Sequence, residues 1–283
     1  MTYPSILMFL DDDARADVRN EQAIRFAQHL GSHVSGLSCH RPVPTGVDMA
    51  VAMGGGFADP LTRELQAAQR EAVDREQRFL ALCDRRQLAS FLSEVDESAE
   101  AGRALLQRAA LHDLVILGQP DPSEDDAARR RAVVDDVVLH SPRPTLLLPY
   151  AGRFEHIGST ALVAWDGSHG AARAVADALP LLKRARTVKV VQFDPQAPRS
   201  GLIDQSPLRG VVQWLGRHGV QATGEVRYAG MDIGNALLSY TADVGADLLV
   251  MGCWGHGRLA ERLLGGATRT VMESMTVPVL TSR

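Results

Sequence analysis

The strongest candidate for chemistry is a glycine-rich segment near the end of the chain. The apolar residues 248–251 lead into Gly252, Gly255 and Gly257, and a glycine pair, residues 265–266, precedes an expected helix. Glycine adopts positive φ at little cost and lets a ligand approach the backbone closely. Successive backbone N–H groups in such a loop form an anion-binding nest, and the helix start adds unpaired N–H groups and a positive dipole end. The segment therefore has the groups needed to hold a di- or triphosphate without a lysine.

The same glycines also have a purely structural interpretation. Glycines are common in turns at strand and helix ends, and three-glycine motifs often occur without a ligand. Here the segment follows an expected buried strand, precedes a helix and lies at the end of a parallel strand, where α/β sheets bind ligands. This context favours phosphate binding over a structural role.

The segments that must position this loop alternate between short apolar runs and helical patterns. Unbroken apolar runs such as residues 6–10 are typical of strands covered on both faces. The first half has expected strands at residues 6–10, 33–38, 88–94, 113–118 and 145–148, and expected helices at 20–30, 60–84, 99–111 and 127–140. The second half repeats this order, with strands at 160–165, 187–193, 223–228, 247–252 and 278–281, and with helices after Ser168, at 211–217, at 233–244 and from about 267.

Two halves with the same order of elements indicate an internal duplication. Strands that alternate with helices predict a parallel sheet with helices on both faces. We therefore predict an α/β chain of two tandem doubly wound, Rossmann-like domains that pair as a pseudo-dimer. The predicted domains are residues 1–152 and 157–283, and the boundary lies in the turn-forming segment 151–159.

Several features of the second half resemble one family of α/β proteins. Gly252, two residues, Gly255, nine residues and Gly265 look like the signature of the universal stress protein family. In that signature Gly, two residues, Gly, nine residues and Gly are followed by Ser or Thr. Asp166 after the first strand resembles the strand-end Asp of the family, and the ending at residues 277–280 is also similar.

The resemblance implies a nucleotide site in the second domain. In the ATP-binding members the strand-end Asp lies near the adenosine and the glycine loop holds the phosphates, so Asp166 would contact adenosine. The implied cofactor is ATP or a related adenine nucleotide, with Mg²⁺. The predicted site residues are Ala164, Asp166, Met251, Gly252, Gly255, Gly257, Gly265, Gly266 and Ala267.

Two residues of this segment depart from the family pattern. Gly266 stands where Ser or Thr is usual, so one hydroxyl contact to phosphate is missing. Trp254 stands where a smaller or polar side chain is common, and it could narrow the pocket or stack on a base. The backbone donors survive both changes.

The first half resembles the family in element order, in Asp11 and in residues 113–118 and 144–148, but its loop differs. Residues 119–126 (Gln-Pro-Asp-Pro-Ser-Glu-Asp-Asp) contain no glycine at the family's spacing. Prolines remove N–H donors, and carboxylates repel phosphate. We predict that this domain does not bind nucleotide by the family mode and instead replaces one subunit of a family dimer as a packing partner.

Size and composition restrict the class of protein. The 283 residues are enough for two domains, and a hydrophobic fraction of 45% suits globular cores. No apolar run reaches the ~18 residues of a membrane span, and the N-terminus lacks a signal-peptide pattern, so we expect a cytoplasmic protein with no membrane contact. Three separated cysteines fit a reducing compartment, and a net charge of -4 gives no electrostatic case for nucleic-acid binding.

Other residues with chemical potential have simpler explanations. Asp11–Asp13 could hold a divalent cation, but a solvated loop with a helix-capping Asp is the more common outcome. Cys253 could be activated by a nearby helix N-terminus, but an inert small residue is the preferred interpretation. Ser168 beside His169 lacks a nucleophile elbow, so an N-cap is expected at Ser168. We assign no catalytic and no metal-binding residue.

Three functions remain open at this point. The first is a stress-response protein that binds ATP or a related nucleotide in its second domain, with little or no catalysis. The second is a ligand-free interaction scaffold for an unidentified protein partner, as a single chain or a homodimer. The third is an adenylating enzyme or ATPase; no acid–base pair or phosphate-loop lysine supports it, so at most slow ATP hydrolysis is expected.

Overall fold

The computed structural model describes residues 2–39, 58–88, 90–91, 101–194, 206–229, 232–253 and 266–283. The elements of the first half are β1 (Ser5–Phe9), α1 (Ala16–Leu30), β2 (His33–Leu37), α3 (Ala58–Arg85), β3 (Ser90–Phe91), α4 (Ala101–Ala109), β4 (Leu114–Gly118), α5 (Ala127–His140) and β5 (Thr145–Leu148). Those of the second half are β6 (Thr160–Ala164), α6 (His169–Leu182), β7 (Thr187–Asp194), α7 (Ser206–Arg217), β8 (Ala222–Tyr228), α8 (Ile233–Asp243), β9 (Leu248–Gly252), α9 (Gly266–Ser274) and β10 (Val279–Ser282).

The described strands form one sheet in the order β3-β2-β1-β4-β5-β10-β9-β6-β7-β8. Within each half all strand pairs are parallel. The strand order reverses between β1 and β4 in the first half and between β6 and β9 in the second. Each half is therefore doubly wound, and the predicted α/β fold class is confirmed.

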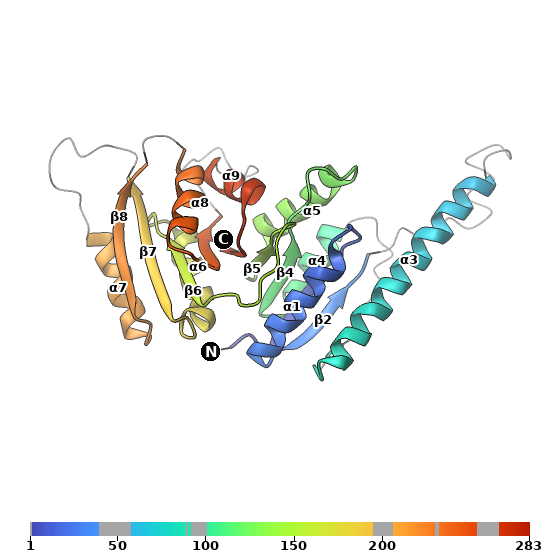
Figure 1. Cartoon of the computed structure of the whole chain (residues 1–283), viewed down its shortest axis with the longest axis horizontal. Coiled ribbons are helices and arrows are strands. Elements are labelled where there is room, and N and C mark those ends of the chain that lie inside the picture. The colour runs from blue at the N-terminus through green and yellow to red at the C-terminus, as the bar shows by residue number, and fades with distance from the viewer. Residues whose placement is uncertain are drawn as a thin grey trace.

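The two halves join through their last strands. β5 and β10 are antiparallel, with Leu146 opposite Leu280 and Thr145 opposite Thr281. The two halves of the sheet are therefore related by an approximate two-fold arrangement at its centre, as Figure 1 shows. The predicted pairing of the two halves within one chain is therefore made by these last strands.

The unbroken apolar strands are explained by a core on each face of the sheet. Ile6 and Met8 of β1 belong to a core that also contains Ile24 of α1 and Ala178 of α6. Leu7, which points the other way, belongs to the core under α4, α5, α8 and α9. Both cores run through strands of both halves, so hydrophobic burial links the halves as well as building each one.

Most differences from the expected elements are shifts of their ends. α1 begins at Ala16 rather than residue 20, because the Asp13 side chain accepts from the Arg15 N–H and the Asp13 carbonyl accepts from the Ala16 N–H. This helix ends at Gly31, which has the left-handed conformation (φ 71°) expected of a C-terminal glycine. None of the helices in the described ranges combines the length and apolar composition that a bilayer crossing requires.

Candidate functional site

The point where the second half reverses its strand order brings the predicted residues of two strands together. β6 and β9 are neighbours, with Val163 opposite Val250, so Ala164 and Met251 stand side by side at the carboxyl edge of the sheet. Met251 is buried and Ala164 is half-buried, while Asp166 lies just beyond the strand and is exposed. The fold thus gathers these residues at the edge where ligands bind in doubly wound sheets.

Gly252 lets the start of α6 pack against the end of β9. A Cβ atom at this position would lie 2.5 Å from the backbone carbon of Gly170 and would also collide with the Ala171 nitrogen. Because both neighbours are backbone atoms of the helix start, no side chain fits without moving the helix. The glycine at this position therefore has a packing requirement of its own, in addition to any contact with a ligand.

Asp166 and Ser168 shape the turn that leads from β6 into α6. Oδ1 of Asp166 accepts a hydrogen bond from the Ser168 N–H (2.9 Å), and the Ser168 hydroxyl accepts from the Ala171 N–H (3.1 Å). The predicted N-cap at Ser168 is confirmed. Oδ2 of Asp166 has no hydrogen-bond partner in the part of the chain that the structure describes, so it can accept a ligand hydroxyl.

α9 starts at the predicted position and is held against α8. It begins at Gly266, which is exposed, and Ala267 is half-buried. The Thr270 hydroxyl donates to Oδ2 of Asp232, the residue whose Oδ1 caps α8 through the Gly234 N–H. This Asp232–Thr270 link was not predicted from the sequence, although an Asp just before a helical pattern signals an N-cap. Gly255, Gly257 and Gly265, with Trp254, lie outside the described residues.

The equivalent edge of the first half is filled by ion-paired side chains. Arg19 of α1 pairs with Asp11 and Asp13, and all three side chains are buried. A Cβ atom on Gly118 would lie 2.7 Å from the guanidinium carbon of Arg19, so this arginine lies directly over the end of β4. Arg130 of α5 adds contacts to Asp11 (3.3 Å) and to Asp12 and Glu124.

The expectation of a solvated loop at Asp11–Asp13 is therefore wrong for two of the three residues. Asp11 is 7% exposed and Asp13 is 8% exposed, because arginines from two helices neutralise them. Burial raises the pKa of Asp11 to about 6, against the opposing effect of Arg19. Neither Arg19 nor Arg130 was singled out in the sequence, since nothing local indicates that a helical arginine returns to a strand end.

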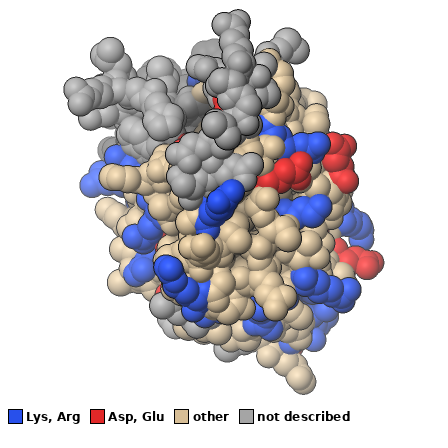
Figure 2. Space-filling view, turned by 90° about the vertical axis from the view of Figure 1, so that its left-hand side faces the viewer, with Lys and Arg blue, Asp and Glu red and all other residues tan. Residues whose placement is uncertain are grey.

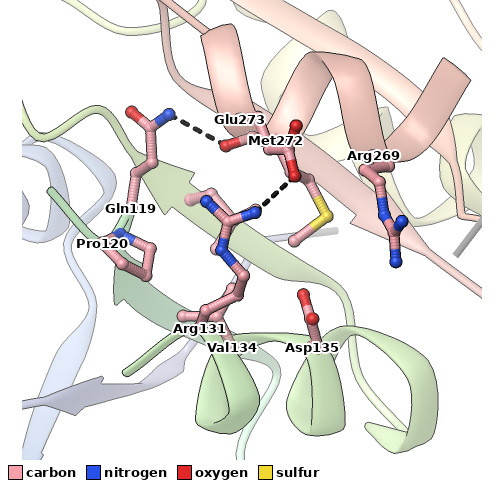
Figure 3. A pocket seen from close by; sticks show the side chains of 9 residues that line it. Gln119, Pro120, Arg131, Val134, Asp135, Arg269, Met272 and Glu273 are labelled. Atoms are coloured by element: carbon pink, nitrogen blue, oxygen red, sulfur yellow. Dashed lines mark hydrogen bonds and ion pairs between the residues drawn. The ribbon is translucent and has the colours of Figure 1, made fainter. Parts of the chain in front are cut away.

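The interface between the halves has contacts that follow its approximate symmetry. Gln119 follows Gly118, and its amide donates to the Met272 carbonyl of the other half (2.8 Å; Figure 3). Cys253 follows Gly252, and its thiol donates to the Val138 carbonyl of the first half (3.5 Å). A small pocket of about 50 Å³ lies beside these contacts, and the ion pair between Arg131 and Glu273 crosses it.

Cys253 is a structural residue at this interface. Its thiol is buried and also donates to the Ser282 carbonyl (3.2 Å). Burial raises the pKa of Cys253 to about 11, so the idea that a helix N-terminus activates this thiol is wrong. The preferred interpretation, an inert small residue, agrees with this environment.

The buried thiol gives a direct test. At pH 8 only about one Cys253 thiol in a thousand would be ionised, and its sulfur is covered, so iodoacetamide should leave it unmodified in the native protein. Peptide mass mapping would check this, with the same reaction in denaturant as the control that should label Cys253 fully. Rapid native labelling would contradict the described packing.

Fold and site together define the class: a chain with two doubly wound α/β halves joined edge to edge, whose second half reverses its strand order between β6 and β9. Residues 159–283 match the model of the universal stress protein family. The second half is therefore a universal stress protein domain, and the resemblance recognised in the sequence is confirmed.

Individual relatives extend the similarity. "Universal stress protein Slr1230" of Synechocystis sp. is 26% identical over 185 residues, which are 60% of this chain and 58% of that protein. A universal stress protein from Archaeoglobus fulgidus DSM 4304 has a TM-score of 0.69 at 17% identity, covering 98% of this chain and 94% of its own. A putative universal stress protein from Pseudomonas aeruginosa UCBPP-PA14 has a TM-score of 0.59 at 15% identity, covering 98% and 92%. These structures share the fold over the whole chain.

Proposed function

We propose that this chain is a stress-response protein that binds ATP or a related adenine nucleotide in its second domain and has little or no catalytic activity. The observation that carries the proposal is the edge at β6 and β9, where Asp166 and Gly252 meet at the reversal of strand order. Ligands of doubly wound sheets bind at this point.

The predicted residues other than Gly252, which packs against the start of α6, would each contact the nucleotide in this proposal. Oδ2 of Asp166 accepts a hydroxyl of the ribose, and Ala164 and Met251 line the strand ends beneath the nucleoside. Gly255, Gly257 and Gly265 allow the backbone to approach the phosphates, and Gly266 and Ala267 offer N–H groups at the start of α9. Mg²⁺ would accompany a triphosphate through its oxygens.

The first half offers a contrast that supports one site per chain. Arg19 covers the end of β4 and is neutralised by Asp11 and Asp13. No comparable ion-paired cluster lies at the β6 and β9 edge among residues 160–194, 232–253 and 266–283. We therefore propose that the first domain acts as the packing partner and binds no nucleotide in the family mode.

The same proposal includes a cellular location, a protein partner and a range of possible nucleotides. We propose that the protein acts in the cytoplasm, in keeping with its three separated cysteines, and that its second domain reports nucleotide levels to a protein partner. The structure of one universal stress protein contains cAMP, and that of another, from Archaeoglobus fulgidus, contains dAMP. These ligands are properties of those two proteins. For this chain the choice among adenine nucleotides is a matter for measurement.

Calorimetry with ATP and Mg²⁺ tests the proposal. We expect saturable binding with about one ATP per chain and loss of binding in Gly255→Val, because a branched side chain obstructs the backbone approach that phosphate requires. Gly216→Val in α7 is the matched control, since a Cβ there meets nothing within 4 Å. Circular dichroism should show both variants folded.

Other outcomes would overturn specific parts. If no binding heat were measured at millimolar ATP, the nucleotide-binding function would be rejected. The ligand-free interaction scaffold would then be the preferred function. Two ATP molecules per chain would show that the ion-paired edge of the first half also opens to ligand. Rapid phosphate release would make the chain an ATPase rather than a binding protein.

A further inference from the structure

A second hollow lies at the opposite edge of the sheet from the proposed nucleotide site. It has a volume of about 370 Å³ and lies between the end of α1, the connecting segment 154–159 and the turn from α6 into β7. In Figure 1 this is the region where the chain crosses from the green strand β5 to the yellow strand β6 beside α1. Its walls therefore come from both halves.

The charges that line this hollow are mostly positive. Arg25, Arg184 and Arg186 line the hollow together with a single carboxylate, Glu155, so the charged side chains of the lining sum to a positive formal charge. Arg184 and Arg186 make no ion pair within the described ranges. Arg25 has only a long contact with Glu21 (3.7 Å), whose carboxylate is closer to Arg86 (3.1 Å).

Buried polar atoms in the same wall have no partner. Gln22 is 4% exposed; its amide nitrogen donates to the Gly152 carbonyl (3.4 Å), while Oε1 is buried and unpartnered. Nε of Arg25 is also buried without a partner. A buried polar group without a hydrogen bond is costly, so the wall of the hollow beside these atoms is not at its most stable.

The floor of the hollow is apolar. Phe26, Leu30 and Leu181 are all buried and line it. An anion with an apolar body would fit this combination better than a bare ion, because the body covers the floor while the charged group meets the arginines at the rim.

The wider surface also favours anions. Figure 2 shows the end of the molecule with α7 and β8, where Lys and Arg outnumber Asp and Glu on the described surface. Arg209 and Arg217 of α7 are exposed, and Arg186 lies just before β7 in the same half. Such a potential raises the local concentration of anions at this end of the molecule.

We propose that this hollow is a binding site for a phosphate monoester with an apolar substituent. Its dianion matches the net positive charge of the lining, and guanidinium groups bind phosphate oxygens in a bidentate manner. The ester part lies on Phe26 and Leu181. Because the ligand contacts α1 and the α6–β7 turn together, it ties the first half to the second.

Calorimetry with phenyl phosphate at constant ionic strength tests this site. We expect saturable binding to the full chain and a loss of about tenfold in affinity for Arg186→Gln, the effect of one charge-assisted hydrogen bond. Lys183→Gln is the matched control: it removes the same charge from a neighbouring exposed residue that does not line the hollow, and should bind like the wild type. Binding should also raise the midpoint of thermal unfolding.

Three results would overturn the proposal. The first is no saturation up to about 10 mM phenyl phosphate. The second is equal affinity of Arg186→Gln and wild type, or equal weakening by Lys183→Gln, which would show only general attraction. The third is loss of phenyl phosphate binding in Gly255→Val, which would place the anion in the glycine loop; retained binding there keeps this site distinct from the nucleotide site.

Discussion

Replacement of Gly252 by alanine should destabilise the folded chain by about 3 kcal/mol, the upper part of the range for overpacking a tight site. The added methyl group would lie 2.5 Å from the backbone carbon of Gly170, so α6 must move away from the end of β9. That movement displaces the turn at Asp166 and should abolish ATP binding even where the variant remains folded. Urea unfolding followed by circular dichroism measures the first effect, and calorimetry measures the second.

Gly216→Ala provides the control for this change. Gly216 lies in α7, and a Cβ there meets nothing within 4 Å, so alanine should leave stability unchanged or raise it by up to about 1 kcal/mol. If Gly252→Ala were as stable as Gly216→Ala, the contact between α6 and β9 would be looser than described. The need for glycine at position 252 would then have to come from a contact with the ligand alone.

Arg19→Met should have the other large effect, a loss of about 3–5 kcal/mol, which is typical when one partner of a buried ion pair is removed. Methionine fills similar space but leaves the buried carboxylates of Asp11 and Asp13 with less neutralisation. The remaining arginine, Arg130, contacts Asp11 but forms no ion pair with Asp13 in the described structure. Urea unfolding at neutral pH measures the loss.

Arg78→Met is the matched control on the surface. Arg78 pairs with Asp17, but both side chains are more than half exposed, so its loss should cost about 1 kcal/mol or less. Equal effects of the two substitutions would mean that water reaches the cluster around Arg19, and the first half would then have an accessible edge like the second.

The sequence by itself determined most of the elements and brought the predicted site residues of β6 and β9 to one edge of the sheet. α5 and β5 have the predicted bounds, residues 127–140 and 145–148, because local signals mark both ends: an apolar pattern, a proline before the strand and charged neighbours. The duplicated order of strands and helices also predicted two doubly wound halves, since βαβ connections leave few alternatives. Ala164, Asp166, Met251 and Gly252 meet at one edge for the same reason: the carboxyl ends of parallel strands lie together.

Tertiary structure decided what those residues contact. The burial of Asp11 and Asp13 depends on Arg19 and Arg130, which come from two different helices. The raised pKa of Cys253 comes from its burial where the two halves meet, and the hollow beside Gln22 depends on the crossing between the halves. Local sequence sets the period of a strand or helix, whereas charge neutralisation, burial and cavities arise only when segments far apart in the chain pack together.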